Sequence, residues 1–143
     1  MKRLLAGLVL MTAGAASAQA ADIKVLSIEA MRPVLQQIAP AYEADSKNKL
    51  KIDYAAPDAV EKQIAGDADY DIVILDKERL DKLYKAAHVA GGSIKSIAKK
   101  GSETFDAATS NWTDQPLPSM AVIDFLHGPK AAEAYKANGM QPG

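Results

Sequence analysis

Apolar positions along the chain switch between two spacings, which predicts strands followed by helices. Residues 23–28 form a short β-rich run. From Met31 the spacing changes to three and four, which is the period of a helix with one apolar face; that face comprises Met31, Val34, Leu35, Ile38 and Tyr42. The same order follows at residues 49–54, a second strand, and in a second helix that carries Val60 and Ile64.

The third strand–helix unit contains the most apolar run of the mature chain. Residues 70–75, YDIVIL, are almost continuously apolar, as in a central strand of a parallel sheet that is covered on both faces. A third helix follows, with Leu80, Leu83, Tyr84 and Ala87 on one face. This order predicts an α/β fold over residues 21–100, with a mostly parallel sheet and helices on both faces.

The pattern weakens after Gly92. Residues 93–100 are compatible with a short strand, and residues 101–118 are polar without a clear period, so we expect an irregular connection there. Helical spacing returns at Ser119, breaks at Gly128-Pro129 and resumes over residues 130–138. Residues 119–143 are therefore predicted to form C-terminal helices that pack on the core.

The first twenty residues have the features of a cleavable export signal. Lys2 and Arg3 precede an apolar run, and small residues then lead to the pattern Ala18-Gln19-Ala20. We expect cleavage after Ala20 and a periplasmic mature protein. The apolar run is too short to span a bilayer, so the mature chain is not expected to insert into the membrane.

Composition excludes several classes of function. The 143 residues are 48% hydrophobic and 24% charged and contain no cysteine, which excludes disulfides, thiolate metal sites and cysteine nucleophiles. Without Lys2 and Arg3, 15 basic residues remain against 18 acidic ones, a net charge of about −3. Nucleic acid is therefore not an expected partner.

Three carboxylates lie just beyond strand ends, where open α/β sheets bind ligands. They are Glu29, Asp58 and Asp76. If they converge, they could hold a divalent cation or a basic ligand through oxygen. The alternative is that Asp58, with Glu61 three residues later, forms a capping box, that Asp76 caps the next helix and that Glu29 is solvated.

The chain resembles the periplasmic molybdate-binding proteins of ABC importers. The resemblance rests on KVLSIEAMRPVLQQIAPAYEAD, on the segment KIDYAAPDAVEKQIAGDADYDIVILDKERLDKLYKAAHVAGGSIKSIAKKG, and on the tail AVIDFLHGPKAAEAYKANGMQPG. It implies a type II periplasmic-binding-protein fold with two lobes and the ligand between them. Residues 93–101 resemble the exit from the first lobe and residue 121 onwards the return, so the chain reads as a single lobe in which residues 101–118 replace the second.

The resemblance also implies a site that this chain has altered. Family members place serines after the first strand and before the second helix, where hydroxyls and backbone N–H groups hold the oxyanion at helix N-termini. Those positions are Ala30 and Pro57 here, so both hydroxyls are absent and Pro57 also lacks an N–H. With Ser27, Glu29, Asp58 and Asp76, they are the candidate ligand-binding residues.

The histidines, the serines and the tryptophan do not form a recognisable metal or catalytic motif. His88 and His127 have no spaced partners and make a poor metal site, and no serine has a nucleophile motif, so neither a metal, a cofactor nor an enzyme is expected. Trp112, the sole tryptophan, either covers the surface that the absent lobe left or contacts a partner.

The sequence therefore predicts a non-enzymatic, periplasmic solute-binding protein of an ABC importer. Its ligand would be a small oxyanion such as molybdate or tungstate, held weakly because the second lobe and both serines are missing, and its partner an ABC permease. One alternative is a protein–protein interaction module or a self-associating single lobe with no transport role. Another is cation binding by Glu29, Asp58 and Asp76.

Overall fold

The computed structural model describes residues 20–143. The export signal expected over residues 1–20 lies, apart from Ala20, outside the described residues. Within residues 20–143, no helix is both long and apolar enough to cross a membrane.

Six strands and five α-helices form the fold of residues 20–143. The strands are β1 (Asp22–Ile28), β2 (Lys49–Ala55), β3 (Ile72–Asp76), β4 (Lys95–Lys100), β5 (Glu103–Thr109) and β6 (Gln141–Pro142). The helices are α1 (Arg32–Ser46), α2 (Pro57–Ala65), α3 (Lys77–Lys85), α4 (Pro116–Leu126) and α5 (Pro129–Ala137), with single 3₁₀ turns η1 (Glu29–Met31) and η2 (Gly91–Ser93).

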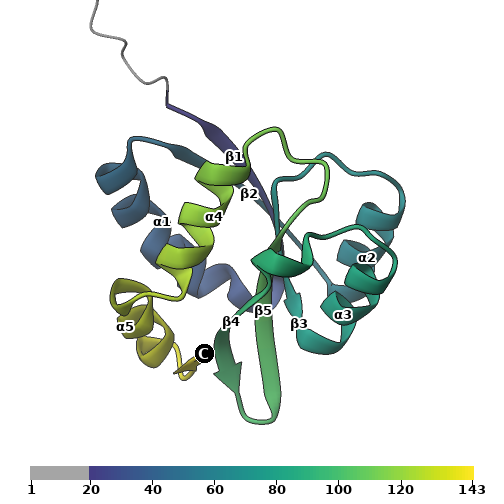
Figure 1. The fold of residues 1–143 in the computed structure, drawn as a ribbon. Helices are drawn as coiled ribbons and strands as arrows, with labels where there is room; N and C mark the ends of the chain where they lie inside the picture. Colours follow the sequence, from purple (N-terminus) through teal and green to yellow (C-terminus); the bar gives the residue numbers. More distant parts are fainter. Residues whose placement is uncertain (1–19) are drawn as a thin grey trace, which may run out of the picture.

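All six strands belong to one sheet with the order β2-β1-β3-β5-β4-β6. Helices α1, α4 and α5 lie on one side of the sheet, and α2 and α3 on the other (Figure 1). The pairs β1–β2 and β1–β3 are parallel, whereas β5 runs antiparallel to both β3 and β4. The α/β fold with helices on both faces is confirmed, and the sheet is mixed instead of mostly parallel.

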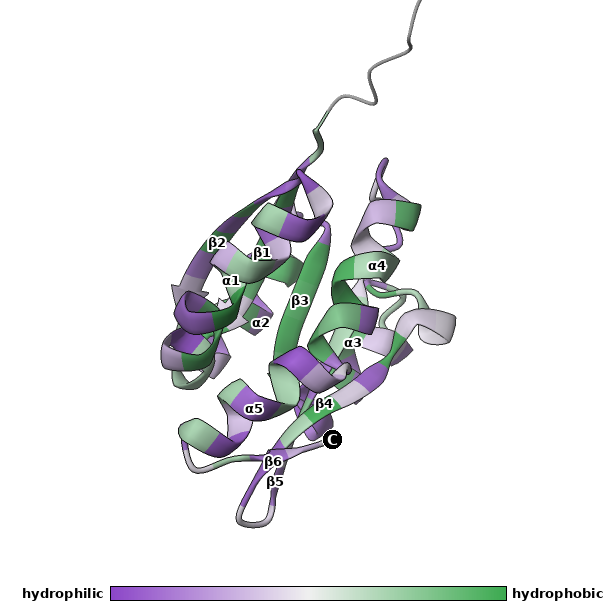
Figure 2. Ribbon diagram, turned by 90° about the vertical axis from the view of Figure 1, so that its left-hand side faces the viewer, coloured by the Kyte–Doolittle hydropathy of each residue, from purple (hydrophilic) through white to green (hydrophobic). Residues whose placement is uncertain are grey.

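Strand β3 is the centre of the core, as its apolar run predicts. Its first four residues are completely buried between the two helix layers, and Figure 2 shows it as a hydrophobic strand in the middle of the molecule. Helices α1 and α3 turn their apolar faces to the sheet through buried side chains at the predicted positions, among them Leu35, Ile38, Leu80 and Leu83. The packing fixes the strand ends that carry the candidate site.

The expectation of an irregular connection over residues 101–118 is wrong for residues 116–118, which begin α4, and for residues 103–109. Residues 103–109 form β5, which pairs with β3 and β4 inside the sheet, and Phe105 to Thr109 are buried. The strand has no long apolar run because Asp106 separates Phe105 from the two small residues Ala107 and Ala108. Asp106 is tolerated in the interior because Ser96 donates a hydrogen bond of 2.8 Å to it.

A two-residue turn joins β4 to β5. Lys100 pairs with Glu103, so Gly101 and Ser102 alone make the turn, and Gly101 has a φ of 60°. A positive φ at the first turn position is what a type II′ hairpin requires, and glycine adopts it without a steric penalty. Because Asp76 pairs with Phe105, this turn lies at the edge of the sheet where the parallel strands end.

Candidate functional site

The candidate site lies where the parallel strands β1 and β2 end. Ile28 and Ala55 are paired in register, and each is followed within two residues by the start of η1 or α2. The backbone N–H groups in the first turn of a helix have no partner within the helix and attract anions. The starts of η1 and α2 therefore lie beside each other, because they follow neighbouring strands. Glu29, Ala30 and Asp58 at these starts are exposed to solvent.

Side chains do not cap these two starts in the described part of the chain. The N-cap residues are Ile28 for η1 and Ala56 for α2, and neither start receives a side-chain cap. The predicted capping box of Asp58 and Glu61 is wrong, because α2 already begins at Pro57 and places Asp58 inside its first turn. Proline suits this first position because its missing N–H has no helical partner there.

Glu29 turns its carboxylate away from the backbone and toward Arg32. The Arg32 Nε and Nη2 atoms donate to the two Glu29 oxygens at 2.5 and 2.8 Å, and the guanidinium lies 4.2 Å from the centre of the Tyr54 ring. Hydrogen bonding from Arg32 lowers the pKa of the Glu29 carboxyl group. Glu29 is thus ion-paired instead of simply solvated, and it does not occupy the donors of η1.

Arg79 gathers three carboxylates at the starts of α2 and α3. Its guanidinium donates to Asp58 at 2.9 Å, to Glu61 at 3.0 Å and to Asp76 at 3.0 Å. These contacts raise the pKa of Arg79, with the hydrogen bond to Asp58 the largest cause. Three negative charges share one positive charge, so this cluster is net acidic.

Asp76 caps α3, as predicted. Its Oδ1 accepts a hydrogen bond of 3.1 Å from the backbone N–H of Arg79. Asp58 and Asp76 do come together, but a guanidinium lies between them, and Glu29 pairs elsewhere. Within residues 20–143, no group of three or more histidine, aspartate or glutamate side chains is arranged to hold a metal ion.

The remaining candidates differ in what they offer a ligand. Ser27 is completely buried and its hydroxyl donates to the Ile28 carbonyl at 3.1 Å, so it faces the interior. Ala30 is exposed in η1 and Pro57 half-buried at the start of α2. Of the two positions where the resemblance implies serines, Ala30 keeps a backbone N–H donor and Pro57 has none, so at α2 the donors come from the residues that follow Pro57.

Sequence reasoning missed the two arginines of this edge. Both follow an acidic residue by three positions, Glu29 to Arg32 and Asp76 to Arg79, which is a spacing that brings side chains together at a helix start. That spacing could have identified the two local ion pairs. The contacts of Arg79 with Asp58 and Glu61 bridge two helices and cannot be read from local spacing.

The large exposed apolar side chains lie away from this edge. Among residues 20–143 they are Tyr84 in the last turn of α3, Trp112 in the loop after β5 and Leu117 in the first turn of α4. Trp112 is 80% exposed, so the interpretation that it covers a surface is wrong. Within residues 20–143, the charged carboxyl edge therefore carries none of the large exposed apolar side chains that would favour self-association there.

Comparison with known families identifies the class of protein. The model of the family described as bacterial extracellular solute-binding protein matches residues 23–102, which is more than half of the chain. The chain therefore belongs to this family, whose members bind solutes and are not enzymes. No curated protein matches the chain significantly.

Solved structures show the same fold at low sequence identity. A substrate-binding domain assigned to a molybdenum ABC transporter of Clostridium difficile matches with a TM-score of 0.78 and 9% identity, covering 85% of this chain and 99% of that chain. The periplasmic molybdate-binding protein of Azotobacter vinelandii gives 0.77 and 12%, covering 82% and 98%. Peb3 from Campylobacter jejuni gives 0.63 and 11%, covering 84% and 99%.

Proposed function

We propose that this protein is a periplasmic solute-binding protein of an ABC importer, reduced to one lobe, that binds a small oxyanion of the molybdate type weakly and in an open site. The observation that carries the proposal is the pair of helix starts at the ends of β1 and β2, which side chains leave uncapped. The donors would be backbone N–H groups of Glu29 and Ala30 in η1 and of Asp58 and Ala59 in α2.

The positions of the carboxylates support this site. A carboxylate that capped η1 or α2 would compete with an oxyanion for the same donors. Glu29 is instead held by Arg32 and Asp58 by Arg79, so both helix starts keep their N–H groups available to a ligand.

Weak binding follows from two features of the same edge. Glu29, Ala30 and Asp58 are exposed, so a bound anion keeps part of its contact with water, whereas tight sites bury most of the ligand. The acidic excess around Arg79 also repels an anion across short distances. The two-residue turn at Gly101 and Ser102 lies at the end of the segment that resembles the exit toward a second lobe, in keeping with a chain that returns without building one.

Restoring a hydroxyl tests the proposal. Ala30→Ser places an O–H donor at the start of η1, and one hydrogen bond to a charged group contributes about 1.5 kcal/mol, so molybdate affinity should rise about tenfold. Titration calorimetry measures this change. The matched control is Ala44→Ser, an equally exposed position near the end of α1.

The affinities of the three proteins show whether molybdate binds at this edge of the sheet. The proposal is supported if Ala30→Ser binds molybdate more tightly than both the parent protein and Ala44→Ser, with chloride at equal ionic strength giving no heat of binding. Equal affinity in all three proteins, or no binding in any of them, would contradict it.

A further inference from the structure

The edge of the sheet opposite the candidate site carries the most exposed aromatic side chain. Trp112 lies in the loop between β5 and α4 and is 80% exposed. Two surface hollows flank it, one lined by Asp67 and His88 and the other by Lys24 and Asp114, and both include Asp69 and Tyr70. A large aromatic side chain that folding leaves in water is available for a partner.

The backbone around Trp112 is fixed on both sides. Before it, the Asn111 side chain donates to the Ala87 carbonyl at 2.7 Å, and the Trp112 N–H donates to the Ser110 hydroxyl at 3.1 Å. After it, the Thr113 hydroxyl donates to Asp71 at 2.7 Å. A contact residue on a rigid backbone loses little conformational entropy on binding, which favours affinity.

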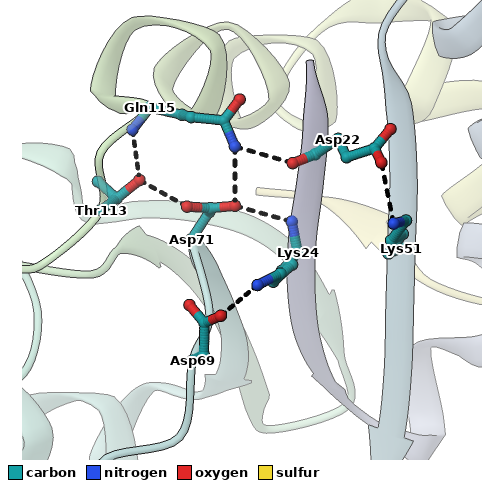
Figure 3. A network of polar contacts seen from close by, with 7 residues as sticks. All are labelled: Asp22, Lys24, Lys51, Asp69, Asp71, Thr113 and Gln115. Carbon is teal, nitrogen blue, oxygen red and sulfur yellow. Dashed lines mark hydrogen bonds and ion pairs between the residues drawn. The ribbon is translucent and has the colours of Figure 1, made fainter.

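The buried carboxylate of Asp71 is the anchor of this loop (Figure 3). It is 5% exposed, accepts from the Lys24 N–H at 2.9 Å, and lies 3.5 Å from the amide nitrogen of Gln115. Gln115 also donates to the Asp22 carbonyl at 2.8 Å. Asp71 thus ties the loop to the beginning of β1 and sets the position from which Trp112 projects.

The surroundings of Trp112 are acidic. Lys24 is ion-paired with Asp69, and this pair is neutral. Asp67 in one hollow and Asp114 in the other are exposed, and within residues 20–143 neither forms an ion pair. Two carboxylates that form no ion pair with another residue of the described range therefore lie in the hollows on either side of an exposed indole ring.

We propose that Trp112, Asp67 and Asp114 form a docking surface for a partner protein that presents an arginine-rich or lysine-rich segment. A guanidinium stacks on an indole face while carboxylates beside the ring neutralise it, so the aromatic and the acidic features select the same partner chemistry. A second copy would bring the same acidic side chains to this surface, and the mature chain has a net charge of about −3, so a basic partner is favoured over a second copy. The proposal is independent of oxyanion binding at the opposite edge.

Fluorescence of the sole tryptophan tests this surface directly, because the chain holds one tryptophan and it is the proposed contact. The probe is tetra-arginine amide, with tetra-glutamate as the opposite charge. We expect a saturable change in Trp112 emission with tetra-arginine, a weaker response at high salt, and none with tetra-glutamate.

Two double variants separate docking from general charge attraction. Asp67→Asn with Asp114→Asn should weaken tetra-arginine binding about fivefold or more, since two nearby charges are lost. Asparagine tolerates the positive φ of 60° at residue 67, and Asp114→Asn alone serves if the double variant does not fold. Glu78→Gln with Glu103→Gln removes the same charge from exposed positions near the other edge and should leave affinity unchanged.

Three results of the peptide titrations would overturn the proposal. They are the absence of a saturable response to tetra-arginine, an equal loss of affinity in the two double variants, and an equal response to tetra-glutamate. A blue shift of Trp112 emission with rising protein concentration alone would identify a second copy as the occupant and would also overturn it.

Discussion

Arg79 and Arg32 determine where negative charge lies at the carboxyl edge. Arg32 holds Glu29 locally, whereas Arg79 connects the starts of α2 and α3 through three carboxylates. Because guanidinium groups present several donors in a fixed plane, one arginine can serve several carboxylates at once. The proposed ligand donors are backbone N–H groups of other residues. The site therefore depends on Arg32 and Arg79 although neither of them supplies a donor to the ligand.

Arg79→Gln should convert the acidic cluster into a cation site. Without the guanidinium, Asp58, Glu61 and Asp76 repel one another, so the melting temperature should fall, and millimolar Ca²⁺ should raise it again because carboxylate oxygens are its preferred ligands. Thermal unfolding with and without CaCl₂ measures both effects.

Arg32→Gln is the matched control for this change. It frees the single carboxylate of Glu29, which is too few ligands for Ca²⁺, so calcium should not stabilise that variant. Stabilisation of the parent protein by Ca²⁺ to the same degree as Arg79→Gln would contradict the role given to Arg79.

Residue-scale prediction from the sequence succeeded where a local rule applies. Asp76 caps α3 because aspartate before a helical run favours the N-cap. Asp58 follows the same rule in sequence, but Pro57 starts the helix one residue earlier and the side chain pairs with Arg79 across 21 positions. Such a contact is decided by tertiary packing, which spacing along the chain does not encode.

Among the elements, β1, β2 and the helices α1 and α2 could be predicted because each has a clear apolar period, and β3 because it has a continuous apolar run. Strand β5 could not, because Phe105 is its one large apolar residue, the other buried residues are small or polar, and its burial comes from neighbours on both sides. Residues such as Ala107 and Asp106 read as a loop in isolation, and tertiary context overrides their low strand preference.

The β4–β5 hairpin depends on the left-handed conformation of Gly101. Gly101→Ala should lower the free energy of unfolding by about 1 to 2 kcal/mol, because a Cβ is disfavoured at a φ of 60° although no atom within 4 Å would clash with it. Chemical denaturation measures this loss.

Gly92→Ala is the matched control for the hairpin. A Cβ added to Gly92 would also enter open space, but the φ of this residue is not positive, so the substitution should change stability by less than about 0.5 kcal/mol. Equal losses in the two variants would show that backbone conformation at residue 101 does not govern the hairpin.

At the scale of the whole molecule, the two edges of the sheet differ in chemistry. The carboxyl edge of the parallel strands is charged and carries the uncapped starts of η1 and α2, and the opposite edge carries Trp112 on a loop tied to Asp71. Sequence reasoning identified the carboxyl edge because parallel strands bring their ends together. It left open whether Trp112 covers a surface or is exposed to contact a partner, because that depends on the anchoring of the loop by residues distant in sequence.

The most direct test of the account is a titration of the ¹⁵N-labelled protein with molybdate, followed by amide chemical shifts. We predict progressive shifts for Glu29, Ala30, Asp58 and Ala59, in fast exchange because binding is weak, and no comparable shifts with chloride at equal ionic strength. Unchanged amides at these four residues, or shifts concentrated elsewhere in the molecule, would contradict the claim that the starts of η1 and α2 bind the oxyanion.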